Sequence, residues 1–330
     1  FLDQIVIYSP QDNRDREDVL RYYADKNALK IGETPEEKNK ILKNAAETTM
    51  GFSVVDIIYL LEKAEQVSKE RGKEFIDKAD MTEAYLQTTT GRPSSIENSP
   101  HKNAIVAKHE CGHALTLQVM HDIAKKENKP WHLPDKINFI TLDPRGNYGG
   151  AMYPKDSENE EYSFEKVFSE MVCDFGGYSS EKHFYNMQGS WGITQDMSMA
   201  TYIARLAVEK MGMGAKTGRI SIDSNPNMQT FISGSLEDKI SSDVQVMLKN
   251  AEYVSNEIVS TYADFIEQFG EKYQDKVGTG ECIIMSDEFQ EQLENWKNSL
   301  SWDKKQKLLE LENKILDVIE KTKKGELVKQ

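Results

Sequence analysis

The chain has 330 residues, of which 38% are hydrophobic and 29% are charged, and this balance indicates a helical, well-solvated protein long enough for two or three domains. Its 55 acidic and 41 basic residues give a formal net charge of −14, which argues against a nucleic-acid partner. Cys111, Cys173 and Cys282 are too widely spaced to suggest a disulfide framework or a thiolate zinc site, and a reducing, cytosol-like compartment fits them best.

The sequence carries no membrane-spanning pattern, since no run approaches the ~18 uncharged apolar residues that a membrane helix requires. It opens without a signal peptide, at Phe1 and inside a hydrophobic segment. We therefore expect a soluble fragment of a longer polypeptide, in which any anchor or targeting signal lies upstream.

The N-terminal part is predicted to be a short strand followed by helices. The strand covers residues 4–8, and the helices cover residues 15–26, 41–49, 54–71 and 78–87. Ser53 is the predicted N-cap of the third helix, and Asp80 or Thr82 that of the fourth. The segment 88–102 is rich in Thr, Ser, Pro and Gly, and it marks a domain boundary.

The most informative stretch is an H-E-x-x-H motif, formed by His109, Glu110 and His113 in a helix-compatible run over residues 102–121. On a helix the two histidines lie about 40° apart, so both imidazoles can reach one metal ion. Glu110 can then hold and deprotonate a water molecule that Zn²⁺ polarises. An ordinary helix with polar residues on its solvated face is the alternative interpretation, because so short a motif also occurs by chance.

The residues around the motif predict a helix with one core face and one ligand face. The core face lies opposite the two histidines and comprises Ala104, Ala107, Cys111, Ala114 and Leu115. On this interpretation Cys111 is a small buried hydrophobe and not a metal ligand.

A small hairpin is predicted after the motif helix. Residues 130–134 form a turn-rich bridge into a strand over residues 137–142, and residues 148–153 are the expected partner strand. Further on, Gly176 and Gly177 permit close approach of a neighbouring helix. Glu181 is a candidate to orient a ligand histidine, and a surface or helix-capping role fits its position equally well.

A catalytic zinc needs three protein ligands and one open position, so a third ligand must come from elsewhere. Asp196 is the preferred candidate. It lies in a helix predicted over residues 195–211 with Thr194 as N-cap, and it extends an apolar stripe toward the core, where a carboxylate needs a cation or strong donors. A first-turn aspartate also suits a helix N-terminus for purely structural reasons. The alternative ligands are His183, Asp174 and Glu181.

The C-terminal part is predicted to be helical. Residues 236–269 form one long helix or a pair, a short helix follows Met285, and an amphipathic helix covers residues 302–324. The apolar stripe of this last helix predicts packing against the body of the chain or against another protomer.

Several of these stretches together resemble the FtsH-type membrane-anchored AAA+ ATP-dependent zinc metalloproteases. The Gly-Phe-Ser string at residues 51–53, with Asp56, resembles the helix entry of their small lid subdomain. Three later segments resemble the family's PRG..LG hairpin, its GG..AEE segment and its GA.ND ligand segment; these are residues 144–150, 176–181 and 192–196.

The resemblance implies a mainly α chain made of three parts. Residues 1–92 correspond to the end of an AAA+ core and its helical lid. Residues 93–300 correspond to an all-helical, zincin-like peptidase domain with a small β-hairpin near the active site. Residues 301–330 are then a C-terminal helical extension.

The resemblance also implies a zinc-dependent endopeptidase. His109, His113 and Asp196 bind one Zn²⁺ per chain, and Glu110 acts as general base and proton shuttle. The edge strand that pairs with extended substrate is implied at Tyr148, Gly149 and Gly150. A small structural hairpin is the other interpretation of that segment.

By the same resemblance, the intact protein is a homohexamer that unfolds polypeptides with ATP for protein quality control, anchored in a membrane with this part facing the cytosol. No G-x-x-x-x-G-K-[ST] string occurs in the sequence. The nearest string, residues 212–218, lacks the glycine before its lysine and is interpreted as a helix exit. ATP is therefore expected to bind only to the full-length protein.

The chain departs from the family pattern at Lys108, Cys111 and Tyr178, where the family has an aromatic residue, an alanine and an arginine. These departures bear on substrate preference, because they remove neither a ligand nor the base. Two alternatives stay open: a catalytically idle scaffold or adaptor ring that keeps the metal site, and an unrelated zincin with an added N-terminal helical region.

Overall fold

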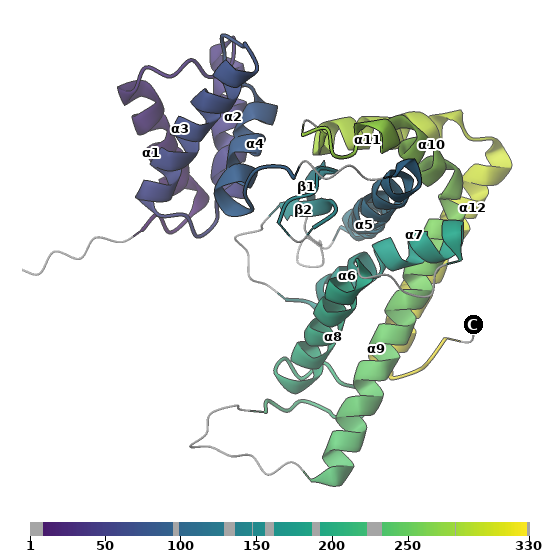
Figure 1. The fold of residues 1–330 in the computed structure, drawn as a ribbon. Coiled ribbons are helices and arrows are strands. Elements are labelled where there is room, and N and C mark those ends of the chain that lie inside the picture. The colour runs from purple at the N-terminus through teal and green to yellow at the C-terminus, as the bar shows by residue number, and fades with distance from the viewer. Residues whose placement is uncertain are drawn as a thin grey trace, which may run out of the picture.

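The computed structural model of the chain describes residues 9–94, 99–128, 136–146, 148–155, 162–186, 192–222, 233–280 and 282–328. Helices dominate these ranges, which confirms the predicted mainly α class (Figure 1). The strand predicted over residues 4–8 and the bridge over residues 130–134 lie outside the described residues. No helix in the described ranges combines the length and the apolar character needed to cross a membrane.

Four helices at the N-terminus pack around a hydrophobic core of their own, and we call them the N-terminal bundle. They are α1 (Asn13–Lys26), α2 (Pro35–Thr48), α3 (Val54–Glu70) and α4 (Lys78–Thr89). Their shared core includes Leu20, Leu42, Ile57, Leu60 and Leu61. Figure 1 shows the bundle to one side of the larger body that the rest of the chain forms.

The caps of the bundle helices explain where the helices begin. Ser53 caps α3 as predicted, because its hydroxyl accepts the N–H of Asp56 while the Asp56 carboxylate accepts the N–H of Ser53. The predicted cap of α4 is wrong: Asp77 and not Asp80 or Thr82 holds that position, and its side chain accepts the N–H of Asp80.

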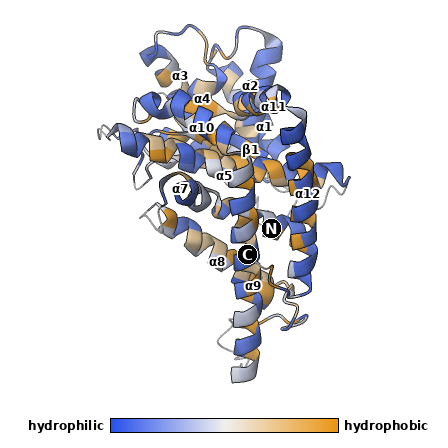
Figure 2. Ribbon diagram, turned by 90° about the vertical axis from the view of Figure 1, so that its right-hand side faces the viewer, coloured by the Kyte–Doolittle hydropathy of each residue, from blue (hydrophilic) through white to orange (hydrophobic). Residues whose placement is uncertain are grey.

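The larger body is built around α5 (Pro100–Lys126), which carries the H-E-x-x-H motif. The helices packed around it and along one another are α6 (Phe164–Asp174), α7 (Gly176–Tyr185), α8 (Ile193–Glu209), α9 (Gly234–Thr261), α10 (Ala263–Tyr273), α11 (Ser286–Ser299) and α12 (Trp302–Lys323). In Figure 2 hydrophobic residues are visible at the level of α5 and β1, while hydrophilic residues predominate on the outer surfaces of α2 and α12.

Helix α5 is buried on its ligand face as well as on its predicted core face. Every side chain from Ala107 to His121 is buried. The reason lies in the packing, since α6, α7, α9, α10 and the sheet surround this helix on all sides. The histidines of the motif therefore face the interior of the protein and not bulk water.

Glycines set how closely α5 and α7 cross. A Cβ at Gly112 would lie 2.3 Å from the carbonyl oxygen of Gly176, and a Cβ at Gly176 would lie 2.6 Å from the carbonyl oxygen of Gly112. Such distances leave no room for any side chain. The close approach predicted for the Gly176 and Gly177 pair is thereby confirmed, with Gly112 as its counterpart on α5.

Three short strands form an antiparallel sheet beside α5, in the order β2-β1-β3. They are β1 (Lys136–Thr141), β2 (Ala151–Lys155) and β3 (Ile283–Met285). The hairpin of β1 and β2 was predicted, although β2 begins at Ala151 and not at residue 148. Strand β3 was not predicted, because three residues give too short a pattern. Among the described residues β2 pairs only with β1, so its other edge is open.

The C-terminal half contains a helix pair, α9 and α10, where one helix or two were predicted. Helix α12 packs along α9, and Leu311, Ile315 and Val318 are buried in the same core as the residues of α5. This packing bears out the expectation that the stripe of the last helix covers the body of the chain. The domain limits at residues 92 and 300 stay predictions.

The glycine-rich segment over residues 212–218 does not leave its backbone donors free. The amides of Lys216 and Thr217 both donate to the carboxylate of Asp243 on α9, at 3.0 and 2.8 Å. The buried Asp243 carboxylate thus already accepts the backbone N–H groups that a bound phosphate would need. The loop is therefore a helix exit anchored to α9, as its sequence predicted.

We expect Gly112→Ala to lower the free energy of unfolding by about 1–3 kcal/mol, because α5 and α7 must separate to admit the methyl group. Urea denaturation in the presence of a chelator measures this effect without a contribution from metal. Gly234→Ala is the matched control, since a Cβ there meets no atom within 4 Å. Equal midpoints for the two variants would contradict the proposed role of the crossing.

Candidate metal centre

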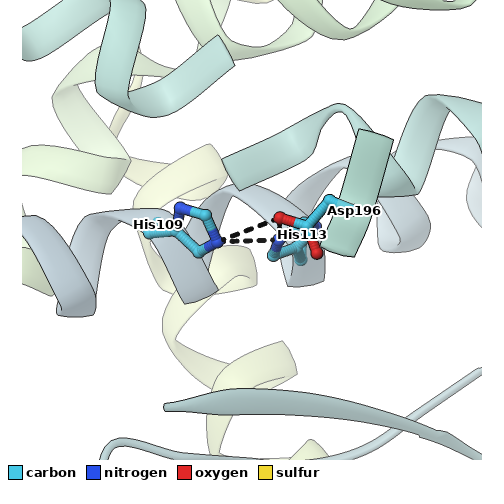
Figure 3. A group of neighbouring side chains, drawn as sticks. All are labelled: His109, His113 and Asp196. Atoms are coloured by element: carbon cyan, nitrogen blue, oxygen red, sulfur yellow. Dashed lines mark hydrogen bonds and ion pairs between the residues drawn. The ribbon is translucent and has the colours of Figure 1, made fainter. Parts of the chain in front are cut away.

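His109 and His113 of α5 converge with Asp196, which lies in the first turn of α8 (Figure 3). The two histidines are one turn apart on α5, and their Nε2 atoms lie 3.1 Å from each other. The Oδ2 atom of Asp196 lies 3.4 Å from each of these nitrogens. Among the described residues this is the cluster of His, Cys, Asp and Glu side chains that could hold a metal ion.

Hydrogen bonds on the far side of each ring fix the tautomers. The Nδ1 atom of His113 lies 2.7 Å from the carbonyl oxygen of Cys173, which can only accept, so Nδ1 carries the proton. The Nδ1 atom of His109 donates to the Glu181 carboxylate at 2.8 Å. Nε2 is therefore the nitrogen of each ring that is available to a metal ion, and the two Nε2 atoms face each other and a carboxylate oxygen.

This arrangement fits a zinc ion. Two imidazole Nε2 atoms 3.1 Å apart need a proton or a metal ion between them, and Oδ2 of Asp196 is buried without a hydrogen-bond partner. In a tetrahedral zinc site with Zn–N bonds of about 2.0–2.1 Å, ligand atoms are separated by roughly 3.3 Å. The observed separations of 3.1 and 3.4 Å lie on either side of this value.

The charges at the site favour a cation. Burial alone lowers the pKa of an imidazole, but the nearby carboxylates of Asp196 and Glu181 raise the pKa of His109 to about 10. Burial alone raises the pKa of a carboxyl group, yet the two imidazoles hold the pKa of Asp196 below its usual range. A metal ion would take over the stabilising role of the imidazole proton, so its binding releases that proton.

Glu110 lies beside the three residues but is not one of the cluster. It is buried, and burial raises the pKa of its carboxyl group. The carboxylate accepts a hydrogen bond from the backbone N–H of Met152 in β2. The chain at Gly150 passes close by, since a Cβ there would lie 3.0 Å from the Cγ of Glu110. Strand β2 and the residues before it thus border the candidate base.

The structure separates the three alternative ligands from the cluster. His183 is exposed on α7, with its ring against Phe184. Glu181 is buried and contacts the far nitrogen of His109, which is the orienting position predicted for it and not a ligand position. Asp174 follows the residue whose carbonyl binds His113, and burial raises its pKa to about 8, but it does not join the cluster.

The local structure that presents Asp196 differs from the prediction in one respect. Helix α8 begins at Ile193, and its N-cap is Gly192 and not Thr194. Asp196 therefore still lies in the first turn, where the helix dipole favours a carboxylate. The stripe below it is buried at Ala200 and Ala207, so the carboxylate is directed into the interior, toward α5.

Two of the three departures from the family pattern point away from the metal centre. Lys108 is buried, forms an ion pair with Glu267 of α10 at 2.8 Å, and lies over the ring of Phe184. Cys111 is fully buried in the core, and burial raises the pKa of its thiol well above the usual value, which confirms its interpretation as a hydrophobe.

Two contributors to the site escaped the sequence analysis, the carbonyl of Cys173 and the N–H of Met152. Both are backbone groups, and no side-chain pattern reveals them. The pair Gly176 and Gly177 was an indirect signal in the sequence for a third feature of the site, the space around the His109 ring. A Cβ at Gly177 would lie 2.3 Å from the ring of His109, so this glycine leaves space for the imidazole.

Comparison with known proteins agrees with this geometry. Residues 97–277 match Peptidase family M41. The chain is 25% identical over 287 residues to the ATP-dependent zinc metalloprotease FTSH 7, chloroplastic, of Arabidopsis thaliana, covering 83% of this chain and 34% of that protein. It is 27% identical over 314 residues to the ATP-dependent zinc metalloprotease FtsH of Streptococcus pneumoniae, covering 91% of this chain and 45% of that protein.

The FtsH of Leuconostoc mesenteroides is 30% identical over 230 residues, which cover 68% of this chain and 30% of that protein. The chain thus spans less than half the length of the relatives it matches. The family match itself covers more than half of the chain and includes His109, Glu110, His113 and Asp196. The chain belongs to peptidase family M41.

Proposed function

We propose that this chain is the zinc-dependent endopeptidase portion of an ATP-dependent protease of the FtsH type, and that it cleaves unfolded polypeptides. The observation that carries the proposal is the convergence of two imidazole Nε2 atoms and a buried carboxylate oxygen, at the spacing of a tetrahedral zinc site. Membership of a peptidase family and the names of the relatives support the same conclusion.

In this proposal His109, His113 and Asp196 hold one Zn²⁺ and leave a fourth position open. The bound ion supplies a Lewis acid that polarises the scissile carbonyl and lowers the pKa of a water molecule. Glu110 accepts the proton of the attacking water and then donates it to the nitrogen of the departing amine. Glu181 and the Cys173 carbonyl keep the two imidazoles oriented throughout.

The open edge of β2 suits an extended polypeptide. Main-chain hydrogen bonds along a strand edge hold a peptide without reading its side chains, as a protease of unfolded proteins requires. Tyr148 is 40% exposed, and Gly149 and Gly150 lead directly into β2 beside Glu110. We assign substrate pairing to this edge, with Tyr148, Gly149 and Gly150 at its entrance.

The remaining parts of the proposal concern the intact protein. The relatives are named ATP-dependent, and the segment of this chain that most resembles a phosphate loop is occupied by Asp243. We propose that ATP acts on another part of the intact protein. A homohexamer anchored in a membrane, with this portion on the cytosolic side, is the arrangement we propose for the whole.

Replacing Glu110 by Gln should abolish cleavage of unfolded casein, with a loss of about 10²–10⁴-fold, because the amide cannot accept the proton of water. Zinc should stay bound in both proteins, at about one per chain. Casein cleavage and elemental analysis on the same preparations measure the two quantities. Zinc in both proteins with cleavage in neither would contradict the peptidase and favour a scaffold or adaptor that keeps the metal site.

The assignment of the third ligand is tested by a pair of aspartate variants. Asp196→Ala should lose both zinc and activity, because only two ligands would remain. Asp174→Asn should retain zinc, because Asp174 lies near His113 without joining the cluster. Elemental analysis after dialysis against a weak chelator compares the two variants. The reverse pattern would make Asp174 the ligand.

Glu181→Gln should weaken zinc binding by about 10–100-fold without abolishing it, because the carboxylate that raises the basicity of His109 becomes a neutral amide. Competition with a fluorescent zinc chelator gives the affinity. Glu252→Gln serves as the control. The Glu252 carboxylate of α9 forms an ion pair with Lys182, which follows Glu181 on α7, and it lies away from the histidines. An unchanged affinity for Glu181→Gln would show that this hydrogen bond does not tune the ligand.

A further inference from the structure

The N-terminal bundle is joined to the sheet by a buried ion pair. Glu83 of α4 and Arg145, in the turn after β1, approach to 2.5 Å, and their side chains are 3% and 1% exposed. Arg145 also donates to the carbonyl oxygen of Gly91 at 2.9 Å. Removal of either charge would leave the other buried and uncompensated, so the pair holds α4 in one position relative to β1.

An aromatic cluster forms a second connection. The ring of Tyr85, also on α4, lies 6.3 Å from Phe139 of β1 and 6.3 Å from Tyr153 of β2. Those two rings stack on each other at 4.7 Å, and Phe52 stacks on Tyr85 from the bundle side at 5.9 Å. Rings at these distances attract one another beyond simple burial. A continuous row of side chains thus leads from the bundle to β2.

Helix α2 supplies a third connection, this time through polar groups. Asn138 of β1 accepts a hydrogen bond from Asn44 at 3.2 Å and donates one to the hydroxyl of Thr48 at 2.8 Å. Lys155, the last residue of β2, forms an ion pair with Glu47. Both strands of the hairpin are therefore attached to the bundle on the side away from α5.

The same hairpin contacts the candidate base on its other side. Met152, next to Tyr153 in β2, donates its N–H to the carboxylate of Glu110. The backbone at Gly150 lies against the Glu110 side chain. Because β2 has a strand partner on one side only within the described ranges, its position relative to α5 depends on β1 and on the contacts with the bundle.

We propose that the N-terminal bundle sets the position of β2 and thereby of the Glu110 carboxylate, with Glu83, Arg145 and Tyr85 as positioning residues for the peptidase reaction. This inference rests on the proposed function. A shift of the bundle relative to the sheet moves the strand that donates to the base, so the state of the bundle controls the turnover of the metal centre. A misplacement of about 1 Å at a reacting group is enough to cost up to 10²-fold in rate.

The test compares Tyr85→Ala with Tyr85→Phe in the 330-residue chain, with three readouts: zinc content, kcat and KM on an unfolded peptide, and amide hydrogen exchange of residues 151–155. Tyr85→Ala should speed exchange of β2 and lower kcat by about 10-fold or more, with KM and zinc unchanged. Tyr85→Phe keeps the ring and should match the parent. If Tyr85→Ala does not fold, Tyr85→Leu replaces it.

Lys78→Ala is the matched control, because Lys78 bridges the bundle to Asp287 of α11 at 3.3 Å without contacting the hairpin, and it should match the parent. Unchanged exchange of residues 151–155 in Tyr85→Ala would overturn the inference, as would a loss of zinc or faster exchange throughout α5. Failure of the proposed function is distinguishable, since the parent itself would then not cleave, whereas the exchange of β2 is measured independently of cleavage.

Discussion

The close crossing of α5 and α7 is the constraint on which the metal centre depends. Gly112 and Gly176 meet backbone to backbone, with no space for a side chain on either helix. At this separation Gly177 lies under the ring of His109, and Glu181, one turn later, reaches the Nδ1 atom of that ring. Without the crossing, the histidine would have neither its space nor its hydrogen-bond partner.

The protein alone does not satisfy the groups that it brings together at this point. Nearly all buried polar atoms in folded proteins have a hydrogen-bond partner. Here two imidazole Nε2 atoms lie 3.1 Å apart, and the Asp196 oxygen beside them has no hydrogen-bond partner. We therefore expect the free energy of this site to fall when a cation enters it, which would couple metal binding to the stability of α5 and α8.

The three-stranded sheet connects the candidate base, Glu110, with the N-terminal bundle. The backbone N–H of Met152 in its hairpin contacts Glu110, and the side chains of Phe139 and Tyr153 contact the N-terminal bundle. An edge strand is well suited to this double role, because it is paired on one side and adjustable on the other. The same open edge is where we place the substrate, so substrate, base and bundle meet at β2.

The sequence by itself determined the local features: the mainly α class, the Ser53 cap, and the shared helix face of His109 and His113, because each depends on residues within one or two turns. The prediction of Asp196 as the third ligand depended on the apolar stripe of its helix and also on the resemblance to the FtsH-type proteases. Only the tertiary structure decided that α5 is buried on all sides, that the Cys173 carbonyl binds the His113 ring, and that the N–H of Met152 meets Glu110. Backbone groups are alike at every position, and packing between segments far apart in the chain selects which of them take part.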